Sequence, residues 1–252
     1  MEKAQANIRI NELRAIIIEA NRKYYVENAP TLSDYEFDML LKELEALEKE
    51  HPDLVTPDSP TQKVGSDLDQ KEAKGKAKEF LQYPHRFPML SLGNTYDIAE
   101  VQAFADRAAK GIGNTFTYSC ELKFDGTAIC LTYRNGKLFR ALTRGDGTVG
   151  DDVTENARQI GNIPQQLSGS GWPEEFEIRG EVYMPWAAFD RLNEEREREE
   201  EQPFANPRNA ASGTLKLQNS AVVASRKLDA YLYYMLGETL PDTGHYECLQ
   251  QA

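Results

Sequence analysis

The chain has 252 residues, of which 40% are hydrophobic and 28% charged, so it can bury a sizeable core as one large or two smaller domains. Its formal net charge of −12 argues against gripping duplex DNA unaided, because phosphate binding depends on clustered lysine and arginine. No signal peptide or membrane span is recognisable, and the three cysteines lack the Cys-x-x-Cys spacing of a zinc site. We expect Cys120 and Cys130 to be buried thiols on strands, in a reducing cytosol.

Two helices are expected at the N-terminal end, over residues 4–27 and 33–50. The second begins with a capping-box pair, Ser33 and Glu36, and Pro52 ends it. Leucines recur along this helix at helical spacing and predict its apolar face: Leu40, Leu41, Leu44 and Leu47.

Acidic and aromatic side chains gather where these two helices meet. Asp34 and Asp38 are one helical turn apart, so both carboxylates point to the same side near the helix start. Tyr24 and Tyr25 come just before the turn and bring aromatic rings close to that pair. Carboxylates at a helix start are ordinarily charges that the helix dipole favours. By itself, the grouping is therefore as compatible with a structural role as with a binding role.

Residues 53–84 are expected to be a linker. They contain prolines and then a run of Lys, Glu and Gly from Asp69 to Lys78, which is typical of a solvated segment. A capped helix is predicted to follow, beginning at Asp97 with Glu100 in its first turn and closing at Gly111.

A strand is predicted over residues 118–125, and it carries the most suggestive residues of the chain. At a period of two, Cys120, Leu122 and Phe124 would face the core, whereas Glu121, Lys123 and Asp125 would share the other face. Gly126 would break the strand where the backbone turns or where a ligand approaches closely.

Lysine is a covalent nucleophile only as the neutral amine, so its pKa must fall from about 10.4 to near 7. The flanking carboxylates favour the ammonium, and desolvation, a metal ion or a cationic substrate would have to offset them. A solvated strand lysine is the ordinary alternative for Lys123.

A hairpin is predicted next, with strands near 127–134 and 137–143 joined by Asn135-Gly136. The glycine-rich loop that follows, Gly145-x-Gly147-x-x-Gly150, precedes an expected helix near 152–160 and satisfies the dinucleotide fingerprint of oxidoreductases. That fingerprint belongs to parallel βαβ units, whereas the preceding strand is in an antiparallel hairpin. An NAD-dependent oxidoreductase using residues 145–150 is therefore an alternative that the context disfavours.

The remaining elements are a strand over 175–184, a helix from Pro185 to about Glu201, a short helix beginning near Asn206, and a strand over 228–236. The first turn of the short helix, together with Arg208, could hold a phosphate, although capping is the structural alternative. The alternation of helices with short antiparallel strands predicts an α+β chain. We expect a small helical module over residues 1–70 and a mostly antiparallel core over residues 71–252.

Five ordered motifs carry a resemblance to a known family. Lys123-Phe124-Asp125-Gly126 resembles the first motif of covalent nucleotidyltransferases, and Glu181 within 177–183 resembles their third motif. Three further stretches, residues 85–97, 143–152 and 204–217, resemble the bacterial NAD-dependent DNA ligases. The resemblance runs from about residue 8 to the end of the chain.

This resemblance implies attack of the Lys123 amine on the adenylyl phosphorus of NAD, with release of nicotinamide mononucleotide. AMP would then activate the 5′-phosphate of nicked duplex DNA, and Mg²⁺ would neutralise the phosphates and help keep the lysine neutral. The family also implies a bacterial cytoplasmic protein, no membrane and a monomer. The nucleotide contacts implied are Glu121 and Leu122 to adenine, Glu181 to ribose, Arg144 against the nucleotide, Ser91 and Leu92 lining the pocket, and Asp125, Gly126 and Arg208.

The N-terminal helices resemble the module that binds the nicotinamide mononucleotide half in these ligases. A pyridinium cation suits aromatic faces and carboxylates, so the residue types agree with that role. The position of Tyr25 is commonly His in the family, that of Phe37 is commonly Tyr, and that of Lys216 is commonly Arg. The contacts implied here are Tyr24, Tyr25, Asp34, Tyr35, Glu36, Phe37 and Asp38.

The family's later lysine motifs are expected after the strand at 228–236, and the 252 residues do not contain them. The sequence therefore predicts an adenylation core that is incomplete at its C-terminal end, which binds the adenosine part of NAD yet is adenylated slowly or not at all. Two further alternatives stay open: a non-catalytic nucleotide-binding remnant, and an ATP-using ligase or capping enzyme, against which residues 1–50 argue.

Overall fold

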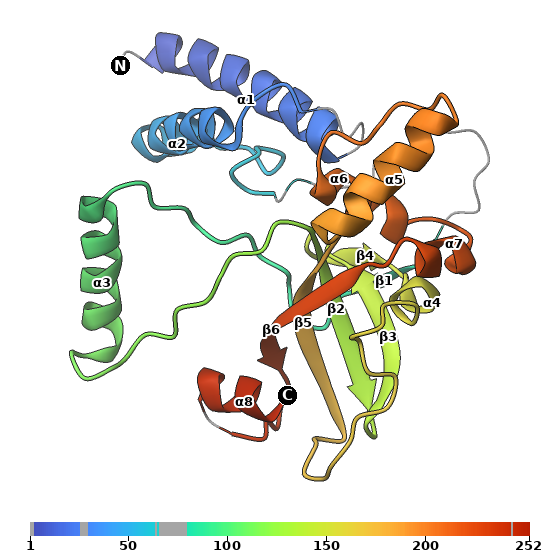
Figure 1. Cartoon of the computed structure of the whole chain (residues 1–252). Coiled ribbons are helices and arrows are strands. Elements are labelled where there is room, and N and C mark those ends of the chain that lie inside the picture. Colours follow the sequence, from blue (N-terminus) through green and yellow to red (C-terminus); the bar gives the residue numbers. More distant parts are fainter. Residues whose placement is uncertain (1–2, 26–29, 64, 66–79, 243) are drawn as a thin grey trace.

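The computed structural model describes residues 3–25, 30–63, 65, 80–242 and 244–252. Its N-terminal part is a pair of helices, α1 (Lys3–Tyr25) and α2 (Asp34–Glu50), which lie side by side in Figure 1. The capping box of Ser33 and Glu36 is confirmed, and Pro52 begins a short 3-10 helix (Pro52–Leu54). The apolar faces of both helices form a small core of their own: Ile10, Leu13, Ile17, Leu44 and Leu47. Residues 26 and 27, the expected end of the first helix, lie outside the described residues.

The central feature is a four-stranded antiparallel sheet of order β3-β2-β5-β6. Its strands are β2 (Thr127–Arg134), β3 (Lys137–Thr143), β5 (Glu175–Tyr183) and β6 (Asp229–Leu236). The predicted hairpin is confirmed, because Asn135 and Gly136 both have positive φ (49° and 72°), as a tight turn between β2 and β3 requires. The expected α+β class is confirmed.

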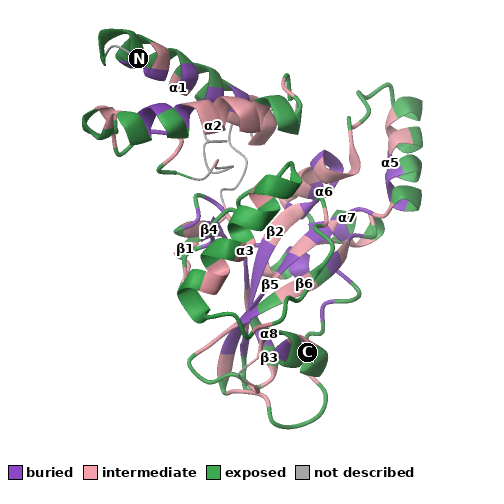
Figure 2. Ribbon diagram, turned by 90° about the vertical axis from the view of Figure 1, so that its left-hand side faces the viewer, coloured by how far each residue is buried: buried purple, intermediate pink, exposed green. Residues whose placement is uncertain are grey.

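The two faces of this sheet have different surroundings. On one face, cross-strand pairs such as Leu131 with Ile178 and Tyr133 with Phe176 are buried in the main core. That core also takes side chains from α4 (Thr154–Ala157), α5 (Trp186–Arg198), α6 (Pro207–Leu215) and α7 (Ser220–Ser225). Figure 2 shows the buried residues concentrated along β2 and β5. The opposite face carries Glu181, whose cross-strand neighbours are Ala128 and Tyr231.

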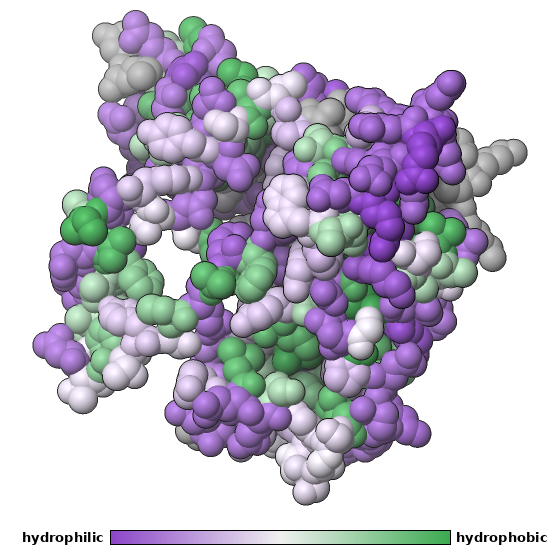
Figure 3. All heavy atoms as spheres, viewed as in Figure 1, coloured by the Kyte–Doolittle hydropathy of each residue, from purple (hydrophilic) through white to green (hydrophobic). Residues whose placement is uncertain are grey.

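Three peripheral elements lie around the sheet. A two-stranded sheet pairs β1 (Gln82–Pro84) with β4 (Val149–Asp151), and α8 (His245–Gln251) packs against β6. Helix α3 (Ile98–Ile112) stands apart from the sheet in Figure 1, none of its residues is buried, and Figure 3 shows apolar side chains on it. Asp97 caps α3 as predicted. The helix closes at Gly113 rather than Gly111: the Gly113 N–H still donates to the Ala109 carbonyl, and the positive φ of Gly113 (84°) then turns the chain out of the helix.

The predicted strand over residues 118–125 is wrong. These residues have no regular structure, and β2 begins only at Thr127. A Cβ on Gly126 would lie 2.1 Å from the Val182 carbonyl oxygen, so only glycine allows the chain to pass that close to β5. Before this point the chain has no neighbouring strand, and an alternating pattern without a partner forms no sheet. The expected helix near 152–160 is likewise reduced to the single turn of α4.

The glycine loop at residues 145–150 does not begin a helix. Gly145 and Gly147 have positive φ (57° and 88°), and the chain then enters strand β4, which pairs antiparallel with β1. Every strand pair among the described residues is antiparallel, so the parallel βαβ unit that the oxidoreductase alternative needs is not found there. The run from Asp69 to Lys78 lies outside the described residues. Among the helices that the structure describes, none has the length and apolar character to cross a membrane.

Candidate nucleotide site

Glu181 is the centre of the candidate site. It lies near the end of β5 on the face opposite the core, and burial raises its pKa to about 7, although the charges of Arg208, Lys123 and Arg144 oppose that rise. A half-buried carboxyl group with a perturbed pKa among several cations marks a candidate functional site. The structure therefore brings together four of the predicted site residues from four separate stretches of the chain.

Lys123 reaches this site from the irregular segment before β2. Its side chain is exposed, and the close approach of Gly126 to Val182 brings the chain beside Glu181, whose Cγ would lie 3.1 Å from a Cβ at position 126. The Phe124 ring packs on two tyrosines of the sheet, 4.2 Å from the Tyr231 ring and 5.7 Å from the Tyr183 ring. This stacking fixes the residue that follows Lys123 without a strand pairing.

The expected apolar face of this segment is wrong in part. Cys120 is exposed and Leu122 is 80% exposed, because residues 118–125 have no strand to place alternate side chains in the core. Only Phe124 is partly buried, and it packs on the same face of the sheet as Glu181 rather than in the main core. Cys130, the other expected buried thiol, is buried.

Arg208 connects the core to the helical module. It follows the first residue of α6, which Asn206 caps by accepting from the Asn209 N–H. Its guanidinium binds the Asp125 carboxylate at 2.9 Å and lies over the Tyr24 ring, 4.4 Å from the ring centre. Tyr24 is partly buried beneath this guanidinium, and burial raises the pKa of its hydroxyl.

Arg144 makes a second connection of the same kind. Its guanidinium lies 5.2 Å from the centre of the Tyr25 ring and donates a 2.9 Å hydrogen bond to the Gly65 carbonyl. The Arg144 carbonyl lies 3.0 Å from Nε2 of His85. Two neighbouring tyrosines of α1 are thus each covered by an arginine of the core.

Three of the stretches that carry the family resemblance are joined by direct contacts. The backbone N–H groups of His85 and Met89 donate to the carbonyls of Thr148 and Gly147, both at 2.8 Å. Lys216 binds Asp151 at 2.8 Å, and both side chains are only 11% exposed. The residues around the site are therefore held in one arrangement although they are far apart in sequence.

Asp38 belongs to a second polar group, between α2 and the start of α3. Its carboxylate accepts hydrogen bonds from the Tyr96 hydroxyl and from the Asn94 amide. The Tyr35 ring meets the Tyr96 ring edge to face, with centres 5.4 Å apart. Asp34 is close enough for its charge to raise the pKa of both Tyr24 and Tyr96, so the acidic pair faces one aromatic region.

The remaining predicted residues have other surroundings. Glu36 accepts from the N–H and hydroxyl of Ser33 as part of the capping box, and Phe37 packs against the core of the helix pair. Ser91 and Leu92 are exposed on the irregular segment between β1 and α3. Glu121 accepts from the Ser119 hydroxyl and lies 2.8 Å from Nε2 of His245 in α8.

Sequence reasoning missed several residues that contact the predicted ones. Asn94 and Tyr96, which donate to Asp38, lie within the motif at residues 85–97, and that motif could have indicated them as site residues. Tyr231 lies beside Glu181 on the sheet, and the sequence of its predicted strand has no apolar alternation that would have indicated this face. His245 had no local signal, because its partner Glu121 lies more than a hundred residues earlier.

A metal site built by the protein is not found among the described residues, since no three His, Cys, Asp or Glu side chains come together there. Mg²⁺ retains several waters and usually binds through substrate phosphates with one or two carboxylates. The described side chains therefore do not form a magnesium site of their own.

The sheet, its covering helices and the helical pair define a nucleotidyltransferase-like α+β domain preceded by a helical module. The chain belongs to the NAD-dependent DNA ligase family: the model of the NAD-dependent DNA ligase adenylation domain matches residues 77–252. The model of the DNA ligase-like N-terminal NAD⁺-binding domain matches residues 3–65.

Relatives named DNA ligase are similar to the chain along nearly all of its length. The protein from Parabacteroides distasonis is 59% identical over 244 residues, and that from Bacteroides fragilis is 57% identical over 244 residues. Each match covers 97% of this chain and 36% of the relative. A DNA ligase of Chlorobaculum tepidum is 50% identical over 262 residues, which cover 37% of its length. The chain therefore spans little more than a third of these relatives.

Proposed function

We propose that this chain carries out the adenylation step of NAD-dependent DNA ligation. The Lys123 nitrogen, as the free amine, forms a bond to the adenylyl phosphorus of NAD. The pyrophosphate P–O bond breaks, nicotinamide mononucleotide leaves with the bonding electrons, and a lysine–AMP phosphoramide remains. The observation that carries the proposal is that the charges of Arg208, Lys123 and Arg144 all act on the half-buried carboxyl group of Glu181.

Different core residues contact different parts of the adenylate. Glu181 accepts hydrogen bonds from the ribose hydroxyls, and Arg144 and Arg208 neutralise phosphate charge as it builds up in the transition state. Glu121 and Leu122 contact adenine, Asp125 holds Arg208 in place, and Ser91 and Leu92 cover the pocket. The stacking of Phe124 on Tyr231 supports this assignment of contacts, because it holds the residue next to Lys123 against the sheet face that carries Glu181.

The helical module, proposed as residues 1–70 before a core of residues 71–252, binds the nicotinamide half. Tyr24 and Tyr25 offer aromatic faces, and Asp34 and Asp38 offer negative charge, to a cationic ring. Tyr35 and Phe37 support this surface through the Tyr96 ring and the helix-pair core, and Glu36 supports it by capping α2.

The later steps belong to the whole protein. AMP passes from Lys123 to the 5′-phosphate at a nick in duplex DNA, and the 3′-hydroxyl displaces it to seal the strand. Mg²⁺, which the resemblance implies, would enter with the phosphates of NAD. We further propose a monomer that acts in the bacterial cytoplasm, away from membranes.

Product analysis tests the reaction class. The chain is incubated with NAD and Mg²⁺, and the small molecules are separated by liquid chromatography. Release of nicotinamide mononucleotide, absent when Lys123→Arg replaces the wild type, is the expected result. Formation of NADH with any reduced substrate, or release of nicotinamide mononucleotide by Lys123→Arg, contradicts the proposal.

A further inference from the structure

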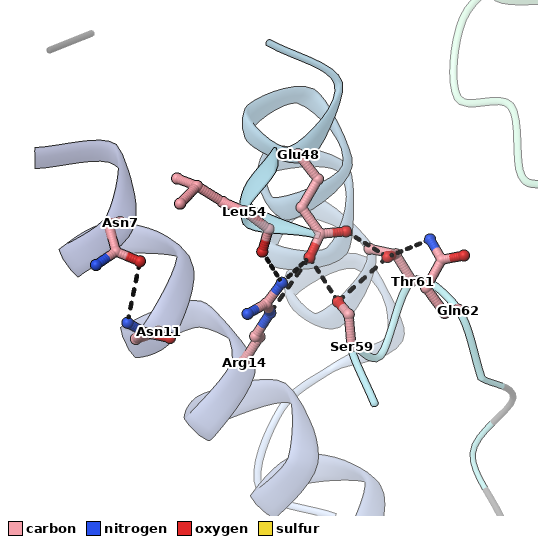
Figure 4. Close-up of polar contacts among 8 residues, drawn as sticks. All are labelled: Asn7, Asn11, Arg14, Glu48, Leu54, Ser59, Thr61 and Gln62. Atoms are coloured by element: carbon pink, nitrogen blue, oxygen red, sulfur yellow. Dashed lines mark hydrogen bonds and ion pairs between the residues drawn. The ribbon is translucent and has the colours of Figure 1, made fainter. Parts of the chain in front are cut away.

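Glu48 is a buried carboxylate that the proposed reaction does not use. It lies on α2 and is only 4% exposed. Figure 4 shows its partners: Arg14 of α1 donates at 2.6 and 3.2 Å, Ser59 donates at 2.6 Å, and the Thr61 hydroxyl also donates. Burial alone would raise the pKa of Glu48, but these hydrogen bonds outweigh it and the pKa is lowered, so the group stays ionised.

This network fixes the chain that leaves the helix pair. Arg14 also donates to the Leu54 carbonyl at 2.9 Å, so the segment is tied to α1 and α2 at Leu54, Ser59 and Thr61. Two turns shape this segment. The Ser59 N–H donates to the Thr56 carbonyl, and the Gln62 N–H donates to the Ser59 carbonyl. A buried polar network in which each member has its partners holds one geometry, because any slip leaves a charge unsatisfied.

The segment ends at residue 63 of the described range, and two positions further along the chain the Gly65 carbonyl accepts from Arg144 at 2.9 Å. A Cβ on Gly65 would lie 2.2 Å from Cε2 of Tyr25 and 2.9 Å from Oδ1 of Asn21, so this backbone presses against the tyrosine ring. The Arg144 guanidinium lies over the same ring. Gly65, Tyr25 and Arg144 therefore form a single contact between the helical module and the core.

We propose that Glu48 is a remote positioning residue, which sets the Gly65 carbonyl and through it the placement of Arg144 against Tyr25. This inference rests on the proposed function of the site, where Arg144 faces the nucleotide and Tyr25 the nicotinamide half. Losing the network would misplace the contact between the two halves of the NAD site. The AMP half, which the core holds through Glu121 and Glu181, would be affected less.

The test uses the double variant Ser59→Ala/Thr61→Val, which releases the segment at Ser59 and Thr61 but keeps the Arg14–Glu48 ion pair and the Arg14–Leu54 hydrogen bond. The matched control is Glu43→Gln, which breaks the ion pair between Arg9 and Glu43 (2.7 and 2.8 Å). That pair also joins α1 and α2, and it makes no hydrogen bond or ion pair with the described residues of the segment from Pro52 to Gly65. Binding of NAD and of AMP is measured by calorimetry, after thermal unfolding has confirmed that each variant is folded.

The double variant should weaken NAD binding roughly 3- to 30-fold, a typical range for residues that act through a neighbour, while AMP binding stays within about twofold. Combining it with Arg144→Lys should give less than the product of the separate effects on NAD binding, because both changes act on one contact. If the network had only a structural role, the double variant would weaken NAD and AMP binding equally, and its effect would add to that of Arg144→Lys.

Hydrogen exchange supplies a measurement that needs no ligand. Exchange in the peptide carrying Arg144 and Gly145 should be faster in the double variant and unchanged in Glu43→Gln. If the unmodified chain binds NAD and the double variant binds it equally well, or if Glu43→Gln loses as much, the inference is overturned. If the unmodified chain binds no NAD, the proposed function fails instead. In that case hydrogen exchange still tests the positioning role, and unaltered exchange at Arg144 in the double variant overturns it.

Discussion

The guanidinium carbon of Arg208 lies 4.4 Å from the centre of the Tyr24 ring, so a cation of the core already covers one face of this tyrosine. The same guanidinium binds Asp125, two residues after Lys123. A pyridinium ring that stacks on Tyr24 must use the other face or replace the guanidinium. NAD binding and the contact between module and core are therefore expected to depend on each other.

Tyr24→Leu should weaken the binding of NAD and of nicotinamide mononucleotide about 5- to 30-fold, since a desolvated cation–π contact contributes about 1–2 kcal/mol. Binding of AMP should be nearly unchanged. Titration calorimetry with the three ligands measures this directly. Tyr83→Leu is the matched control, because it removes a comparable contact with Arg140 (3.7 Å) outside the site. An equal loss of AMP binding would argue that the substitution disturbs the core.

Glu181→Gln should stabilise the fold at alkaline pH while weakening nucleotide binding. Burial raises the pKa of Glu181 to about 7 from an ordinary value of 4.5, so the folded state holds this proton more tightly than the unfolded state. The free energy of unfolding therefore falls as pH rises from about 4.5 to about 7, by up to about 3 kcal/mol from this group. Urea unfolding at pH 4.5 and at pH 8 should show a gain for Glu181→Gln only at pH 8.

The control for this prediction is Glu197→Gln, an exposed glutamate of α5, which should unfold like the wild type at both pH values. The same Glu181→Gln variant should lose AMP affinity, because an amide is a weaker acceptor for ribose hydroxyls than a carboxylate. A variant that is no more stable at pH 8, or that binds AMP normally, would contradict this account of Glu181.

Lys216→Met should destabilise the fold by about 3–5 kcal/mol, because it leaves the buried Asp151 carboxylate without its cation. Lys216→Arg should recover most of this loss, since the positive charge remains. Urea unfolding near neutral pH measures both. Equal stability of Lys216→Met and the wild type would mean that the ion pair is not what joins β4 to α6.

Local features were predictable because their causes lie within a few residues. The capping box of Ser33 with Glu36 and the hairpin at Asn135-Gly136 depend on neighbouring side chains and on backbone sterics, and both are confirmed. The strand predicted at 118–125 failed because alternation describes only one chain, whereas a strand also needs a partner. Gly126, expected to break a strand, instead marks the place where the sheet begins.

The sequence predicted which residues belong to the candidate site better than it predicted which residues contact one another there. Lys123, Arg144, Glu181 and Arg208 were all expected near a nucleotide, and the structure brings them together. The partners of Asp38 and Glu121, namely Tyr96 and His245, were not expected, because these contacts join distant stretches of the chain. The pairing of β1 with β4 also joins distant stretches of the chain, and it was not predicted. Each of these strands has only three residues, which is too short for an alternating pattern to be recognised.

The position of the covalent adduct tests the central claim most directly. The chain is incubated for hours with NAD and Mg²⁺, since the sequence predicts adenylation that is slow at best, and is then digested under mildly alkaline conditions that preserve the phosphoramide. Peptide mass spectrometry should find one adenylyl group on Lys123 and none in the Lys123→Arg variant. An adenylyl group on another residue, or one that persists in Lys123→Arg, would contradict the account.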